Sequence, residues 1–112
     1  MKKTDSFTYT SKFGTVYNDC FFEISSYTTT GNHAISIFNE EEGMICTCTV
    51  NAQRVNEPNE IGVKNYSENE GMVDFLIGMG IIEKKPFTFE HSGFVMIPYF
   101  KLTESGLELV NS

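Results

Sequence analysis

At 112 residues the chain has the length of one domain, and a domain of this size buries roughly two-thirds of the surface that its unfolded chain exposes. Hydrophobic residues make up 40% of the sequence, with ten Phe and five Tyr, which excludes an intrinsically disordered chain. No apolar run reaches the ~18 residues of a membrane-spanning helix. The net charge of −7 disfavours direct binding to nucleic acid, because a negative surface repels phosphate.

The N-terminus and the cysteines both indicate the cytoplasm. The N-terminal lysines are followed by Asp5 and other polar residues rather than by an apolar segment, so we expect no signal peptide. The three cysteines, Cys20, Cys46 and Cys48, are an odd number and lack the spacing of a disulfide framework. Such a set is typical of a reducing compartment.

Short strands are predicted for the first half of the chain. Aromatic residues and threonines around Gly14 place the first two at residues 7–9 and 13–17, as a strand with a bend or bulge. Alternating side chains place the others at residues 20–28, 33–38 and 44–50. In the third of these strands, Cys20, Phe22 and Ile24 share one face. Because short turns join the last three strands, we expect them to form an antiparallel meander.

The second half of the chain begins with a predicted loop at residues 51–60, which has little periodicity and is a candidate contact site. Further strands are expected at residues 61–66, 81–83, 87–90 and 94–102. The last of these is apolar on both faces, as in a central strand. Pro98 has no N–H to donate, however, so we expect a bulge or a sheet edge there. The tail from Thr103 is expected to extend a strand or to form a helical turn.

Residues 67–79 form the one clearly amphipathic segment. Ser67 and Glu70 have the spacing of a capping box, which predicts that a helix begins at Ser67. Gly80 lies where a left-handed C-terminal cap is expected. The apolar stripe of this helix consists of Met72, Phe75, Leu76 and Met79, widened by Val73 and Ile77.

No catalytic, cofactor-binding or metal-binding motif rises above chance. Cys46 and Cys48, with His33 or His91, have the residue types of a zinc site, but the paired C-x₂-C spacing is missing. Core packing is therefore the preferred interpretation of the two thiols. Both histidines fall at predicted turns without a paired nucleophile. We expect a protein that is not an enzyme and holds neither metal nor cofactor.

Acidic residues are concentrated in the middle of the chain. Residues 36–76 contain eight acidic side chains against Arg54 and Lys64, a local charge of −6. A surface of this sign is complementary to a basic partner, although solubility alone also accounts for a net charge of this size. The candidate partner-binding residues are Glu40, Glu41, Glu42, Glu57, Glu60, Glu68, Glu70 and Asp74.

Two segments carry a resemblance to a known family. Tyr66 to Ile81, with the pattern YSENEGM…FL…GI, and Gly93 to Pro98, GFVMIP, resemble small uncharacterised proteins of phages, plasmids and integrative elements. These elements belong to low-GC Gram-positive and gut bacteria, and the likeness covers about residues 20–102. It implies an accessory protein of a mobile genetic element, for which interference with host defence or element maintenance is expected. No activity, and hence no catalytic residue, comes with it.

Together these observations predict a single α+β domain: a curled, mostly antiparallel sheet of roughly five to seven strands with one helix packed on it. The preferred function is a non-catalytic module that binds a basic surface of a host protein, in its sharper form an inhibitor of a defence or DNA-handling protein by charge mimicry. The alternative is a small-molecule-binding module with a pocket between helix and sheet, lined by Phe75, Met79, Phe94 or Phe100. We expect no membrane association, and a monomer or a weak homodimer through a sheet edge.

Overall fold

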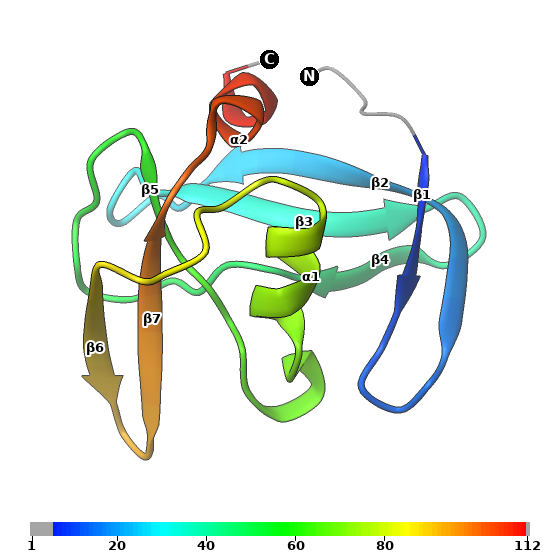
Figure 1. The fold of residues 1–112 in the computed structure, drawn as a ribbon, viewed down its shortest axis with the longest axis horizontal. Coiled ribbons are helices and arrows are strands. Elements are labelled where there is room, and N and C mark those ends of the chain that lie inside the picture. Colours follow the sequence, from blue (N-terminus) through cyan, green and yellow to red (C-terminus); the bar gives the residue numbers. More distant parts are fainter. Residues whose placement is uncertain (1–5, 112) are drawn as a thin grey trace.

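The computed structural model describes residues 6–111, which form seven strands, a 3₁₀-helix and two short α-helices. The strands lie in two separate antiparallel sheets (Figure 1). The first contains, in spatial order, β1 (Phe7–Thr10), β2 (Val16–Ser26), β3 (His33–Asn39) and β4 (Gly43–Thr47). The second contains β5 (Glu60–Gly62), β7 (Val95–Lys101) and β6 (Thr88–Ser92). The α+β class is confirmed, whereas the prediction of one curled sheet is wrong.

The first sheet follows chain order, which confirms the predicted meander. Residues 11–15, part of which was predicted as a strand, instead form the turn of the β1–β2 hairpin, and Ser11 N donates to Thr15 O at 2.9 Å. Phe7 pairs with Cys20 but Tyr9 with Tyr17, so β2 contains one extra residue, a β-bulge. Asp19 in this bulge has a φ of 54°, a left-handed conformation that Asp and Asn adopt more readily than most residues.

In the second sheet the proline strand is central, and the expected bulge is absent. Pro98 lies opposite Phe89 in β6, and the register of this pair of strands does not shift. The Pro98 carbonyl accepts from Val63 N at 3.0 Å, so its ring nitrogen faces the same side, where β5 has ended at Gly62. The missing N–H therefore falls outside the ladder, which is why a central strand tolerates this proline.

The two sheets meet along the chain that links β4 to β5. Lys64 N donates to Cys48 O at 2.8 Å and Val50 N to Gly62 O at 3.1 Å, on either side of an isolated bridge between Thr49 and Val63. The core is continuous across this junction. Its buried residues include Cys20, Phe22, Ile35, Ile37, Cys48, Ile61, Val63, Leu76, Phe100 and Leu102.

The central helix begins later than predicted. Ser67–Asn69 is a 3₁₀-helix, η1, and the α-helix α1 spans Met72–Gly78. Ser67 has a φ of 56° and η1 has no side-chain cap, so the capping-box prediction is wrong. Gly71, with a φ of 94°, turns the chain into α1, and the Asn65 side-chain oxygen accepts from Val73 N at 2.9 Å. That bond satisfies one of the amides left free at a helix start.

The end of α1 is as predicted. Gly80 has a φ of 75°, its N–H donates to Ile77 O at 3.0 Å, and Ile81 N donates to Leu76 O at 3.0 Å. These two bonds make a Schellman motif, for which glycine is the preferred residue. On the buried face of α1, the Phe75 ring lies 5.0 Å from the Tyr9 ring and 5.8 Å from the Phe7 ring. The helix therefore packs against β1.

A second helix, α2 (Glu104–Val110), follows β7, where a helical turn was one of the two expectations. The Thr103 side chain caps its start by accepting from Gly106 N at 3.0 Å. Leu109 is buried, and Leu107 and Val110 pack against the core. Neither α-helix in residues 6–111 has the length and apolar character needed to cross a membrane.

Candidate functional site

The eight predicted partner-binding residues lie in three separate parts of the molecule. Residues 40–42 lie in the β3–β4 turn. Glu60 is the first residue of β5, and Glu57 lies three residues before it. Residue 68 lies in η1, residue 74 lies in α1, and residue 70 lies between them. In Figure 1 the β3–β4 turn and the loop before β5 are at opposite sides of the molecule. The structure therefore does not bring these eight side chains into one patch.

Glu60 is the member of this set that lies in the interior. It is only 5% exposed, and its carboxylate lies 3.2 Å from Arg54 Nη2 and 3.9 Å from Lys101 Nζ. The same carboxylate accepts from the Glu57 amide at 3.0 Å. Two cations thus balance its charge, and Glu60 ties the end of the 51–60 loop to β7 rather than presenting charge at the surface.

Two other members are paired at the surface. The Glu68 carboxylate lies 2.7 Å from Lys64 Nζ, four residues earlier in the chain, and the Glu70 carboxylate lies 3.0 Å from Lys12 Nζ on the β1–β2 hairpin. Exposed pairs of this kind contribute little to stability, but they reduce the negative charge available to a partner. Glu57 and Asp74 are exposed, as are the three glutamates of the β3–β4 turn.

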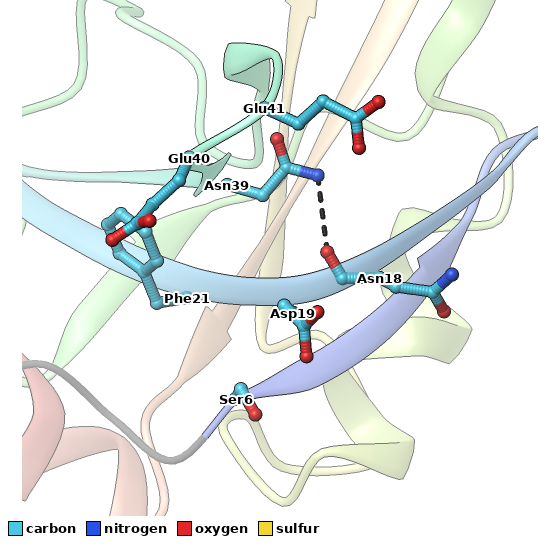
Figure 2. Close-up of a pocket in the computed structure, with 7 residues that line it drawn as sticks. All are labelled: Ser6, Asn18, Asp19, Phe21, Asn39, Glu40 and Glu41. Carbon is cyan, nitrogen blue, oxygen red and sulfur yellow. Dashed lines mark hydrogen bonds between the residues drawn. The ribbon is translucent and has the colours of Figure 1, made fainter.

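The β3–β4 turn forms one wall of a pocket of about 470 Å³ (Figure 2). Within residues 6–111, its lining contains three carboxylates, two side-chain amides, an aromatic ring and a hydroxyl, and no basic side chain. The lining residues are Ser6, Asn18, Asp19, Phe21, Asn39, Glu40 and Glu41. The pocket therefore joins two of the predicted residues to Asp19, which the sequence did not indicate.

Asn39 positions the two walls of this acidic pocket relative to each other. It is 5% exposed, and its Nδ2 donates to the main-chain carbonyl of Asn18 at 3.2 Å, the bond drawn in Figure 2. Its Oδ1 accepts from the Glu42 amide at 2.7 Å. One neutral, buried side chain thus connects the β2 bulge to the acidic turn.

The lining combines negative charge with an apolar wall. In Figure 2, Asp19 projects from the β2 bulge on one side of the strand, and Glu40 and Glu41 project from the β3–β4 turn on its other side. Phe21 stacks on Phe38 of β3, with ring centroids 6.1 Å apart, which fixes one face of the pocket. Carboxylates beside an aromatic face suit a Lys or Arg side chain, whose stem is apolar and whose head is cationic.

Asp19 and Asn39 were missed for identifiable reasons. Asp19 comes just before the alternating pattern that begins at Cys20, and its role depends on the bulge, which a periodic pattern does not reveal. The Asn18-Asp19 dipeptide is the available signal, because both residue types tolerate left-handed backbone. Asn39 adjoins a run of three glutamates and is indistinguishable there from an ordinary turn residue.

The side chains expected to line a small-molecule pocket lie apart. Phe100 is in the core at 2% exposure, Phe75 packs against β1, and Phe94 is fully exposed at the tip of the β6–β7 hairpin. Met79 is 36% exposed at the end of α1. Within residues 6–111, no three His, Cys, Asp or Glu side chains are grouped so that they could hold a metal ion.

No protein-family model matches this sequence, and comparisons with curated proteins and with solved structures find no significant match.

Proposed function

We propose that this protein is a non-catalytic, cytoplasmic protein-binding module that takes a basic side chain of its partner into the acidic pocket. The observation that carries the proposal is the lining itself, in which Asp19, Glu40 and Glu41 have no basic neighbour among the lining residues that the structure describes. The Lys or Arg stem would lie on Phe21 while its cationic head meets the carboxylates.

The charge of the whole chain supports the same partner class. With a net charge of −7, the protein attracts basic surfaces and accelerates their encounter over distances of about a Debye length. A host surface that ordinarily contacts phosphate has this character. The resemblance to proteins of mobile elements therefore leads us to propose inhibition of a defence or DNA-handling protein as the biological role.

The test compares two variants that remove the same amount of charge. Asp19→Asn/Glu40→Gln/Glu41→Gln empties the acidic pocket of carboxylates, and the asparagine keeps the left-handed backbone at position 19. Its matched control removes three exposed carboxylates elsewhere: Glu57→Gln/Asp74→Asn/Glu83→Gln. Both variants have three fewer negative charges than the wild type.

Each tagged protein is incubated with nuclease-treated host lysate at two salt concentrations, and retained proteins are identified by mass spectrometry. We expect a basic partner that the wild type and the control retain at low salt, that high salt releases, and that the pocket variant loses. Equal loss from both variants would mean that net charge, not the pocket, attracts the protein. Retention that nuclease abolishes, or that salt leaves unchanged, would also contradict the proposal.

A further inference from the structure

One sheet edge of the protein is open to a further strand. β6 is an outer strand of the second sheet, and no other strand of residues 6–111 pairs with its outer side. In Figure 1 the β6–β7 hairpin extends away from the first sheet, with β6 at its outer side. The register of β6 on β7 is regular from Thr88 to Ser92, and β6 contains neither lysine nor proline. Lysine, proline and a bulge, which commonly block an exposed edge, are therefore missing from β6.

The remaining sheet edges are short or interrupted. β1 has four residues, and its pairing with β2 contains the bulge. The pairing of β4 with β3 shifts register once, and the Thr47 carbonyl accepts from Asn69 Nδ2 at 2.7 Å. Beside β5, the Gly62 carbonyl accepts from Val50 N at 3.1 Å. Short strands and irregular pairing hinder strand addition, so β6 is the edge best suited to it.

Pro98 determines which main-chain groups of β6 face outward. Its carbonyl and ring nitrogen face β5, so the residue opposite it in β6, Phe89, forms no main-chain bond with β7. Bonded and unbonded positions alternate along an antiparallel pair. The main-chain groups of His91 therefore also point away from β7, whereas those of Glu90 point towards it. β6 thus presents the N–H and C=O groups of Phe89 and His91 at its free edge.

The side chains beside this edge are apolar and exposed. Phe89 is 53% exposed and Met96 is 50% exposed, and the strand register places both on the same face of the sheet. The opposite face carries Ile97, which is buried, and Glu90, which accepts from two main-chain amides of the 51–60 loop. One face of the hairpin is therefore closed by a loop, and the other leaves apolar surface uncovered next to unpaired main-chain groups.

We propose that β6 pairs antiparallel with β6 of a second copy of this chain, about a two-fold axis that passes between the two Phe89 residues. In this register the Phe89 N–H donates to the Phe89 carbonyl of the second copy, and the reverse bond follows by symmetry. The second sheets of the two copies then form one continuous sheet across the dimer. The apolar surface of each hairpin is covered by the same surface of the other copy.

Side-chain and charge complementarity favour a second copy in this register. The two Phe89 side chains lie opposite each other as an aromatic pair, and each Glu90 lies opposite Thr88 of the other copy. A register with Phe89 opposite His91 would instead place the two Glu90 residues opposite each other, and like charges in that position destabilise a sheet. A register centred on His91 would leave Phe89 opposite Gly93, without an aromatic partner. β6 is therefore complementary to itself when Phe89 lies on the axis.

The size of this interface predicts a weak dimer. A fully covered aromatic side chain buries roughly 150–250 Å². The half-exposed Phe89 and Met96 therefore contribute less than the ~800 Å² per partner of a standard interface. Standard interfaces bind with affinities of about 1 µM or tighter, so we expect a dissociation constant above about 1 µM.

Salt separates this dimer from binding at the acidic pocket. Each copy has a net charge of −7, so two copies repel each other, and added salt should strengthen the dimer by screening that repulsion. The acidic pocket should bind a basic partner less tightly as salt is added. The two associations therefore respond to salt in opposite directions, and either can fail without the other.

Sedimentation velocity of the full-length chain tests the dimer over a concentration series that extends well above the micromolar range, at two salt concentrations. Phe89→Lys is compared with Phe13→Lys, which replaces a phenylalanine that is 76% exposed on the β1–β2 hairpin and changes the net charge equally. We expect the wild type and Phe13→Lys to dimerise, and Phe89→Lys to dimerise about tenfold more weakly or worse, because it loses a central aromatic contact. A wild type that stays monomeric, or equal weakening by both substitutions, would overturn the proposal.

Phe89→Pro tests the main-chain pairing. The Phe89 N–H lies outside the β6–β7 ladder, so a proline there is compatible with the fold but removes the donor to the second copy. Phe89→Val is the control, because it also removes the ring but keeps the N–H. Circular dichroism should show both variants folded, and Phe89→Pro should dimerise more weakly than Phe89→Val. Equal dimerisation of the two variants would contradict pairing through this amide.

Hydrogen exchange of the wild type tests the same edge without a substitution. The amides of Phe89 and His91 should exchange more slowly as protein concentration rises, because the second copy covers them. Exchange at these amides that does not depend on concentration would contradict the dimer. Protection that appears only with a protein from the host lysate would assign the edge to that protein and likewise overturn the proposal.

Discussion

Asn39 donates a hydrogen bond to the main-chain carbonyl of Asn18 at 3.2 Å and so holds the bulge of β2 beside the acidic β3–β4 turn. Because Asn39 is uncharged, it joins two negatively charged segments without adding a cation that would compete with a partner. The main-chain positions from which the carboxylates project are thus set before any partner arrives. Such preorganisation reduces the conformational entropy lost on binding.

We predict that Asn39→Ala lowers the free energy of unfolding by about 1–3 kcal/mol, because it leaves the Asn18 carbonyl and the Glu42 amide without their partner. Urea denaturation measures this change. Asn51→Ala is the control, since Asn51 is exposed and should cost less than about 0.5 kcal/mol. Equal costs for the two variants would show that Asn39 does not act as a cross-link.

The neighbouring residues Glu57 and Glu60 should respond differently to loss of charge. Glu60→Gln leaves Arg54 and Lys101 without their buried partner and should destabilise the protein by about 1–3 kcal/mol. Glu57→Gln, at an exposed position, should change stability by less than about 0.5 kcal/mol. Urea denaturation of both variants at neutral pH measures the two changes in unfolding free energy. A Glu60→Gln variant as stable as the wild type would show that Glu60 does not stabilise the fold through Arg54 and Lys101.

The second sheet contains a hydrogen-bonded pair that gives stability a pH dependence. Tyr99 donates its hydroxyl to Glu90 at 2.8 Å, and this bond, aided by the amides of Gln53 and Arg54, lowers the pKa of Glu90. Below the ordinary Glu pKa the unfolded chain therefore binds more protons than the folded one. The contribution of Glu90 is complete above that ordinary pKa and is lost as pH falls through the folded value.

We therefore predict that Tyr99→Phe lowers the free energy of unfolding most at neutral pH and progressively less in acid. Denaturation across a pH series measures this difference. Tyr27→Phe is the control, because Tyr27 bonds the uncharged Thr49 and its loss should cost the same at each acidic pH. A constant difference between wild type and Tyr99→Phe would show that the Glu90 carboxylate does not depend on this bond.

Two helical glycines allow a test of whether α2 packs closely against the main chain, because a side chain has space at one of them and not at the other. A Cβ on Gly106 in α2 would overlap the Ile81 carbonyl oxygen, whereas a Cβ on Gly78 in α1 would meet nothing within 4 Å. Gly106→Ala should therefore lower the melting temperature as α2 is displaced from the core. Gly78→Ala should be neutral or stabilise by up to about 1 kcal/mol. Thermal unfolding by circular dichroism gives both values, and the opposite order would show that α2 does not dock through Gly106.

Local patterns predicted the meander and the helix end because both depend on neighbouring residues. The alternation of Phe22 with Ile24, and of Ile35 with Ile37, specifies which face of each strand is inward. Gly80 specifies the helix end because its φ of 75° costs glycine little. The predicted helix start at Ser67 was wrong because it was inferred only from the spacing of Ser67 and Glu70. In the structure the chain forms η1 there, turns at Gly71, and begins α1 at Met72.

The division into two sheets could not be predicted from such patterns. It depends on the pairing of β7 with β5 and β6. The alternation of apolar and polar residues shows which face of a strand is buried, but not which strands pair with it. The candidate site shows the same limit. Glu40 and Glu41 were recognised by charge, but the difference between buried Glu60 and exposed Glu57 depends on Lys101, forty residues or more away in the sequence.

The junction between the two sheets, where the segment that links β4 to β5 bonds to itself, determines how the protein unfolds. Because the bonds Lys64–Cys48 and Val50–Gly62 cross it, neither sheet can open its inner end without exposing part of the other's core. The two sheets should therefore unfold as one cooperative unit, and hydrogen exchange should give the same free energy of opening for the amides of β3 and β7. A partner that binds only at the acidic pocket would then slow exchange in β7, far from the surface it contacts.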